Sequence, residues 1–229
     1  MKYFLFVLFI AISTINKVEA GGKYLYVAGF DSNKVDSFPS GWRGRSKDAK
    51  KFYKVRKEGS LKNQYLEAKV VNSDELIIKK KKVNIVEYPY LNWKWRIHML
   101  PPGGDESIKS KCDVPASMNV ILEADKTLGI PTPKTLKYSW STTLKKGTIT
   151  KSPYAMWPAR CDIVVLQSGE QYKGKWVTEK RNVLKDYLKF YKKDKVDQFY
   201  IDGIVIMSDS DNTTSTAWAD YDSIYFSRN

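Results

Sequence analysis

Short runs of alternating apolar and polar residues occupy most of the chain between residues 24 and 226. A period of two places every second side chain on the same face, which is typical of β-strands with one buried face. Clusters of Pro, Gly, Asn, Asp and Ser separate the runs and indicate turns. The predicted strands cover 24–28, 51–55, 64–71, 75–87, 91–99, 118–123, 135–141, 162–167, 175–178, 199–207 and 217–226. This pattern predicts an all-β chain, an antiparallel sandwich or barrel.

One segment has the helical period instead. From Asn182 onwards, apolar residues at Val183, Tyr187 and Tyr191 recur every four positions and share one face. Asn182 is a suitable N-cap, because its side-chain oxygen can accept a hydrogen bond from the first turn. We therefore expect one short helix near residues 182–193 that bridges two strands across one end of the sheets.

Four consecutive lysines, 79–82, lie inside the predicted strand 75–87. Because side chains alternate between faces, the four cannot all face solvent on a strand with one buried face. An edge strand, or a strand that crosses an exposed end, is the favoured position, and lysines there also block edge-to-edge pairing. The alternative is that the run binds a polyanion.

The first twenty residues have a different pattern from the rest. Lys2 is followed by an apolar run over 4–12, and Val18-Glu19-Ala20 matches the small-x-small motif of a cleavage site. These features predict a secretory signal peptide over 1–20, a single domain over 21–229, and a periplasmic or secreted location. An uncleaved membrane anchor is the alternative, although the run is shorter than the roughly 20 residues that span a bilayer.

The net charge of +14 favours anionic partners. Removal of residues 1–20 takes away two lysines and one glutamate, which leaves +13. Export makes nucleic acid an unsuitable partner, whereas anionic lipid head groups, acidic glycans and cell-wall polymers fit. The alternative is that the lysines serve solubility only, because they are spread along the whole chain.

The chain has two cysteines, Cys112 and Cys161. In an oxidising compartment they could form one disulfide, and the alternative is two buried free thiols. Two cysteines cannot form a four-cysteine zinc site, and the single histidine, His98, adds little to one.

Two tryptophans, Trp93 and Trp95, share one face of the predicted strand 91–99 because they are two residues apart. Burial in the core is one interpretation, since tryptophan is highly buried on average. The other interpretation is a flat aromatic platform on which a sugar ring stacks.

Two acidic segments offer the hard oxygen ligands that calcium prefers. They contain Asp105, Glu106 and, slightly later, Asp113, and then Asp209, Asp211 and Asn212. The alternative in both places is a solvated turn closed by side-chain hydrogen bonds. The second segment lacks the glycine and glutamate that would complete an EF-hand.

The chain contains no nucleophile elbow, no zinc-protease motif and no phosphate-binding loop of the G-x-x-x-x-G-K type. Carboxylates are plentiful, so a pair of catalytic carboxylates as in glycosidases is an open alternative, but no sequence spacing identifies such a pair. His98 is more typical of a structural residue than of a catalytic base.

Several motifs recur in a defined order along the chain. They are LNWKWR at 91–96, LPPGGDE at 100–106 with Asp113 after it, YSWS at 138–141, SPY at 152–154, VVLQSG at 164–169, WVTEKRNV at 176–183 with Asp186 and Tyr187, IMSDSDNT at 206–213, and YDSIYF at 221–226. On these motifs the chain resembles a bacterial family known as domain of unknown function 3047. The family pattern has an acidic pair where this chain has Cys112-Asp113, which would weaken any metal site there.

The family name implies no activity, but its pattern is similar to jelly-roll sandwiches of the galactose-binding and lectin-like kind. In such folds the first and last strands often share a structural calcium, and Asp31 and Asp222 match those positions loosely. The candidate ligand-binding residues are Trp93, Trp95, Arg96, Asp105, Glu106, Asp113, Trp140, Tyr154, Arg181, Asp209, Asp211 and Asn212.

The leading hypothesis is a non-catalytic, monomeric, exported protein of the cell envelope that binds a glycan or another anionic polymer. The rival is a carbohydrate-active hydrolase or lyase on the same fold, and a third possibility is a purely structural envelope protein. The enzyme would need its charged groups to converge in one cleft. Those groups are Arg96, Asp105, Glu106, Asp113, Arg181, Asp209 and Asp211.

Overall fold

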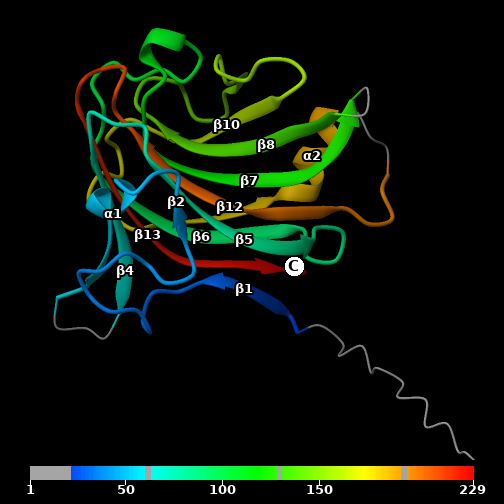
Figure 1. Ribbon diagram of the computed structural model, residues 1–229, viewed down its shortest axis with the longest axis horizontal. Coiled ribbons are helices and arrows are strands. Elements are labelled where there is room, and N and C mark those ends of the chain that lie inside the picture. The colour runs from blue at the N-terminus through cyan, green and yellow to red at the C-terminus, as the bar shows by residue number, and fades with distance from the viewer. Residues whose placement is uncertain (1–21, 60–62, 128–129, 192–194) are drawn as a thin grey trace, which may run out of the picture.

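Two β-sheets pack face to face in the computed structural model (Figure 1). The structure describes residues 22–59, 63–127, 130–191 and 195–229, with the side chains of 125–127 and 130–131 excepted. The predicted signal peptide over 1–20 lies outside the described residues. No helix within the described ranges is long and apolar enough to cross a membrane.

The smaller sheet has the strand order β11-β6-β13-β4-β3, and β1 also pairs with β13. Every pair in it is antiparallel. Its strands are β1 (Tyr24–Ala28), β3 (Tyr53–Lys57), β4 (Gln64–Val71), β6 (Tyr90–Met99), β11 (Val177–Asn182) and β13 (Thr216–Ser227).

The larger sheet has the order β2-β5-β12-β7-β8-β10-β9. Its strands are β2 (Arg43–Gly44), β5 (Leu76–Asn84), β7 (Val114–Thr127), β8 (Ile130–Ser141), β9 (Ile149–Lys151), β10 (Arg160–Ser168) and β12 (Tyr200–Asp209). The predicted antiparallel sandwich of the jelly-roll class is confirmed, with one exception, because β8 and β10 run parallel. The parallel pair follows from the connection between them, which returns to the starting end of β8 before β10 begins.

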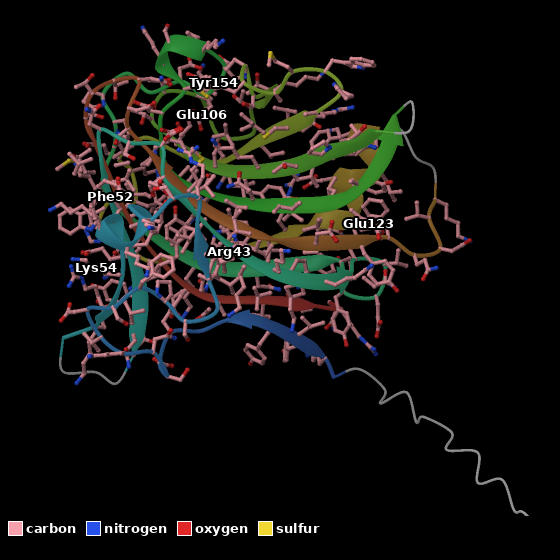
Figure 2. The ribbon with its side chains drawn as sticks, in the orientation of Figure 1. Arg43, Phe52, Lys54, Glu106, Glu123 and Tyr154 are labelled. Atoms are coloured by element: carbon pink, nitrogen blue, oxygen red, sulfur yellow. The ribbon has the colours of Figure 1, made fainter. Side chains whose placement is uncertain are left out.

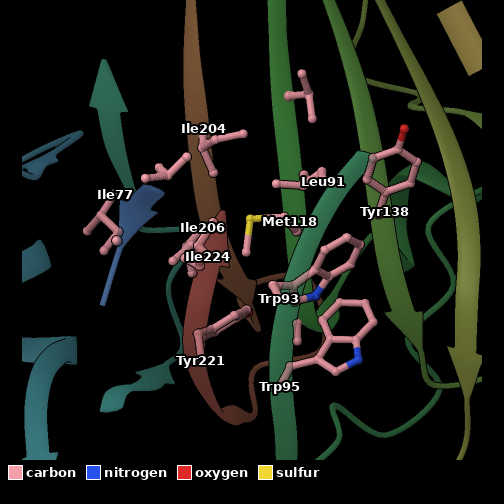
Figure 3. Close-up of a cluster of buried hydrophobic side chains, with 14 of the residues drawn as sticks. Ile77, Leu91, Trp93, Trp95, Met118, Tyr138, Ile204, Ile206, Tyr221 and Ile224 are labelled. Carbon is pink, nitrogen blue, oxygen red and sulfur yellow. The ribbon is translucent and has the colours of Figure 1, made fainter. Parts of the chain in front are cut away.

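The core between the sheets is rich in aromatic rings (Figure 3). Trp93 and Trp95 of β6 meet edge to face, with ring centroids 5.3 Å apart. Trp93 stacks on Tyr138 of β8 at 5.9 Å, and Trp95 meets Trp140 of the same strand at 5.8 Å. These rings are fully buried, so their contacts hold the two sheets together.

Most predicted strands are present with shifted ends, whereas four short elements have no counterpart in the prediction, β2 among them. The other three are α1 (Ala49–Phe52), the 3₁₀ helix η1 (Lys109–Lys111) and β9. The predicted helix is α2 (Val183–Tyr191), and the Asn182 side chain caps it by accepting a hydrogen bond from the Lys185 amide at 2.8 Å. The end of the predicted helix at 192–193 lies outside the described residues.

The lysine run 79–82 lies within β5, where Lys80 and Lys82 are exposed and Lys79 and Lys81 are half-buried. Strand β2 pairs with β5 only at Ile77 and Ile78, so β5 is an edge from Lys79 onwards among the described residues. The lysines therefore protect an exposed ladder of backbone groups from pairing with another chain.

Replacing Trp95 with alanine should destabilise the fold by about 3–5 kcal/mol, because it removes a large buried side chain and leaves a cavity. The matched control is Trp157→Ala, since Trp157 is 79% exposed and its loss should change stability by no more than about 0.5 kcal/mol. Urea unfolding followed by far-UV circular dichroism measures both, and equal effects would contradict the assignment of Trp95 to the core.

Candidate functional site

A cleft of about 530 Å³ lies on the outer face of the larger sheet, the face turned away from the aromatic core. Asn119 of β7, Thr135 and Lys137 of β8, and Val205 and Met207 of β12 line its floor. Their sequence neighbours on the same strands belong to the core cluster. Strand alternation therefore assigns one set of side chains to the core and the other to the cleft.

The loop between β6 and β7 contributes Cys112 to the cleft lining, and its Lys109 carbonyl accepts a hydrogen bond of 3.0 Å from the Tyr154 hydroxyl. Glu106 comes from the same loop, and Figure 2 labels it together with Tyr154. Glu106 is fully buried and accepts a hydrogen bond of 2.5 Å from the Ser141 hydroxyl. Its other carboxylate oxygen has no hydrogen-bond partner. Burial raises the pKa of Glu106, while Lys137 acts in the opposite direction.

Three carboxylates meet at the cleft, from Asp113, Asp209 and Asp211, each offering an oxygen within 4.8 Å of the others. Strand pairing explains the meeting, because Asp209 at the end of β12 lies opposite Val114 at the start of β7. Asp113 precedes Val114 directly, and the turn after β12 brings back Asp211. Among the described residues this is the one group of three or more metal-ligating side chains.

The members of this carboxylate cluster differ in their hydrogen bonds. Asp113 is fully buried and accepts bonds from the amides of Asn212 (3.1 Å) and Thr213 (2.7 Å) and from the Thr213 hydroxyl (2.6 Å). Asp209 is 6% exposed, and its Oδ1 atom has no partner. Asp211 is exposed. Asp113 therefore also holds the turn that carries Asp211.

The electrostatics of Asp209 follow from this position. Burial raises its pKa to about 8, and the charges of Asp113 and Asp211 add to the effect. Lys137, itself 6% exposed on the cleft floor, opposes the shift. Asp209 therefore holds its proton at neutral pH when nothing else compensates its charge.

Both cysteines line this cleft as free thiols, which makes the disulfide predicted between Cys112 and Cys161 wrong. Burial raises the pKa of Cys112 to about 11 and also raises that of Cys161. The two side chains therefore act as small apolar groups in the wall rather than as reactive thiolates.

One aromatic side chain that lines the cleft, Tyr154, is exposed. The hydroxyl of Tyr154 hydrogen-bonds to the amide of Asn212, and its ring is 52% exposed. Met156 and Trp157, from the same loop between β9 and β10, are each 79% exposed. Sequence reasoning selected Tyr154 and Asn212 but missed Lys137 on the cleft floor, because a lysine in an alternating strand normally indicates a solvent-exposed position.

Basic side chains extend the cleft towards the β2 edge of the larger sheet. Arg45, which forms an ion pair with Asp74, lines the cleft and also two neighbouring hollows of about 710 and 460 Å³. Other cations line these hollows: Arg43, Lys47, Lys50 and Lys80. We call these five residues the basic strip; none of them was predicted as a site residue.

Three tryptophans predicted as ligand-binding candidates, Trp93, Trp95 and Trp140, are buried in the core. Their rings contact one another and Tyr138 in the core, so the sugar-platform interpretation of Trp93 and Trp95 is wrong, and Trp140 is enclosed in the same way. The indole nitrogen of Trp140 donates to the Gly169 carbonyl at 2.9 Å, which fixes its orientation.

The two candidate arginines are engaged elsewhere in the fold. Arg96 on β6 bonds Glu58 and Asp220, at 2.9 and 2.8 Å, and its guanidinium lies over the Trp176 ring at 4.5 Å. Arg181 on β11 forms two bonds of 2.6 Å to Asp186 of α2. Neither residue lines the cleft, so the full convergence that the enzyme hypothesis requires does not occur.

Two further predictions concern single carboxylates. Asp105 accepts bonds from the amide and hydroxyl of Ser107, as in a solvated turn. Asp31 accepts a bond from the Gln64 amide, and its charge contributes to the raised pKa of Asp222, after the larger effect of burial. The structure thus places Asp31 near Asp222, and the calcium at this pair stays a prediction.

Comparison with protein families gives one match. The family model described as "Protein of unknown function (DUF3047)" matches residues 40–225 of this chain. Among curated proteins, no relative matches the chain.

Several solved structures are similar to the chain over most of its length. The structure of TmCBM61 in complex with beta-1,4-galactotriose is 13% identical, with a TM-score of 0.41, and the overlap covers 91% of this chain and 100% of that chain. Endoglucanase 3 of Trichoderma harzianum, from family GH12, is 10% identical, with a TM-score of 0.43, over 89% and 93%. Endoglucanase cel12A of Rhodothermus marinus is 9% identical, with a TM-score of 0.42, over 80% and 94%. At these scores the likeness carries no functional weight.

The variant Asp209→Asn should be more stable than the natural chain above neutral pH, in buffer containing EDTA. With a raised pKa, Asp209 binds its proton more tightly in the folded state than in the unfolded state, so it lowers stability progressively as pH rises from about 4 to about 8. Removing this buried, unpartnered charge should raise the free energy of unfolding at pH 8 by about 1–3 kcal/mol.

Urea unfolding at pH 5 and pH 8.5 measures the difference, which should be smaller at pH 5. The control is Asp197→Asn, whose carboxylate is 93% exposed. An Asp209→Asn variant that loses stability at pH 8.5 would contradict this account of the site.

Proposed function

Because the chain belongs to the DUF3047 family, whose description assigns no activity, we propose a function from the geometry of its cleft. The chain is a non-catalytic, extracytoplasmic domain that binds an acidic glycan or another anionic envelope polymer. The ligand lies in the cleft on the outer face of the larger sheet and extends along the basic strip.

The observation that carries this proposal is the continuity between the cleft and the basic strip. Arg45 lines the cleft and both adjoining hollows, and Arg43 and Lys80 line the hollow beside it. An extended polymer needs such a continuous track, and its negative charges would lie against the cations of the strip. A small, isolated ligand would need only the cleft.

The composition of the cleft supports a polyhydroxylated ligand. Its lining combines hydrogen-bonding groups such as Asn119 and Thr135 with aliphatic groups such as Ile121 and Val205. A sugar presents the same mixture of hydroxyls and apolar ring faces. Tyr154, which lines the cleft, has an exposed ring and so offers the stacking surface that the buried tryptophans lack.

Extracytoplasmic location rests on the sequence pattern of residues 1–20, which the structure does not describe. The net charge of the chain supports an anionic partner there. Monomeric binding is part of the same proposal.

A carbohydrate-active enzyme is the second candidate, and one observation favours it. Asp209 lines the cleft and has a pKa of about 8, and a carboxyl group that keeps its proton at neutral pH is suited to act as a general acid. Against it, Arg96 and Arg181 lie outside the cleft. The test is whether the natural chain releases reducing ends from acidic polysaccharides and the variant Asp209→Asn does not. That result would establish an enzyme and overturn the non-catalytic proposal.

The binding proposal predicts that the chain is retained on immobilised acidic polysaccharides such as polygalacturonate, and less on a neutral polymer of similar length. The double variant Arg43→Ser/Lys80→Ser should weaken this binding by about tenfold, since each lost cation contact costs on the order of 0.5–1 kcal/mol. Affinity electrophoresis in gels that contain each polymer measures the retention.

The matched control is Lys57→Ser/Lys175→Ser, which removes the same charge from exposed positions outside the cleft and hollows. Equal weakening by both double variants would show that net charge, and not the basic strip, determines retention. Failure of the folded chain to bind any of the acidic polymers would count against the proposal as a whole.

A further inference from the structure

The carboxylate cluster of Asp113, Asp209 and Asp211 presents an unresolved electrostatic problem. Three acidic groups bring oxygens within 4.8 Å of one another, and two of the three side chains are buried. Two cations, Lys137 and Arg45, line the same cleft, but Arg45 is already paired with Asp74, which leaves Lys137. A single lysine offsets only part of the repulsion between three carboxylates.

A second, independent observation points to a missing partner. Asp209 is more than nine-tenths buried, yet its Oδ1 atom has no hydrogen-bond donor. Among the described residues, no amide, hydroxyl or basic side chain makes a hydrogen bond or ion pair with the carboxylate of Asp209 or with that of Asp211. Buried polar atoms in folded proteins are nearly always satisfied, so an unpartnered carboxylate oxygen aimed at two other carboxylates calls for a cation.

We propose that Asp113, Asp209 and Asp211 form a calcium-binding site at the edge of the cleft. The ligands are carboxylate oxygens, including the Oδ1 atom of Asp113, which accepts only one hydrogen bond in the structure and retains a free lone pair. Three carboxylates supply hard oxygen ligands on a turn between strands, and calcium accepts six to eight such ligands with flexible geometry.

The composition of the site distinguishes it from other metal sites. Neither Cys112 nor Cys161 belongs to the group, although both line the same cleft, and the group contains no histidine. Zinc prefers nitrogen and sulfur ligands, whereas an all-oxygen group suits calcium or magnesium. Magnesium demands stricter octahedral geometry, so the loop-borne cluster favours calcium.

The position of the site adds a role for the cation. Asp209 and Asp211 line the cleft, so coordination positions that the protein leaves free face the same space. A calcium ion there presents positive charge to a sugar hydroxyl or carboxylate. This role in ligand binding rests on the proposed function, whereas cation binding itself does not.

Isothermal titration calorimetry of the EDTA-treated chain with calcium chloride tests the site. We expect saturable binding of calcium and weaker binding of magnesium. The variant Asp211→Asn should lose at least about tenfold in calcium affinity. Asp211 is exposed, so this variant retains the fold. In Asp209→Asn the same loss of binding should accompany an unchanged or raised stability without calcium.

Two control variants locate the binding. Asp197→Asn removes an exposed carboxylate elsewhere, and Asp31→Asn/Asp222→Asn removes the other carboxylate pair predicted to bind calcium. Both control variants should bind calcium at the carboxylate cluster with the affinity of the natural chain. No binding of calcium by the natural chain, calcium affinity that persists unchanged in Asp211→Asn and Asp209→Asn, or preference for zinc would each overturn the proposal.

Polysaccharide retention measured with calcium and with EDTA separates the two proposals. If the chain binds calcium but is not retained by any polysaccharide, the proposed function and the cation's role in ligand binding are contradicted. The proposed calcium site is then still supported. Retention that is equal in calcium and EDTA removes the cation's role in ligand binding, and leaves the basic-strip proposal intact.

Discussion

Burial of aromatic rings between β6 and β8 is the interaction on which the rest of this molecule depends. Trp93 and Trp95 of one sheet contact Tyr138 and Trp140 of the other, and these rings account for four of the largest fully buried side chains. Because strand side chains alternate, seating Tyr138 in the core places Lys137 on the opposite face. The packing of the core therefore also determines which residues reach the cleft.

The sequence predicts those features that depend on local periodicity. The period of two along 64–71 and 91–99 is sufficient to identify strands, and the four-residue spacing after Asn182 identifies the helix with its cap. The location of each strand within a sheet is not local information. Periodicity near 118–141 therefore gave two strands but not their neighbours, and it gave no sign of the parallel pairing of β8 and β10.

The same limit applies to the candidate site. Asp113 and Asp209 are almost a hundred positions apart, and each was selected for its residue type alone; only the register between β7 and β12 brings them together. Trp93 and Trp157 are the same residue type with opposite exposure, and only tertiary contacts separate them. Lys137 was missed because a lysine in an alternating strand normally indicates solvent, whereas here the loop from β6 to β7 and the cleft walls enclose it.

The parallel pairing of β8 and β10 has a consequence for how this fold can diversify. A chain that leaves β8 must travel back along the sheet before β10 begins, so the connection over 142–159 is long. It carries the exposed side chains of Tyr154, which lines the cleft, and Trp157 outside the hydrogen-bonded ladder. Changes of length or composition in such a connection leave strand register untouched. Relatives with the same two sheets are thus free to evolve different rims, and with them different selectivities, without redesigning the core.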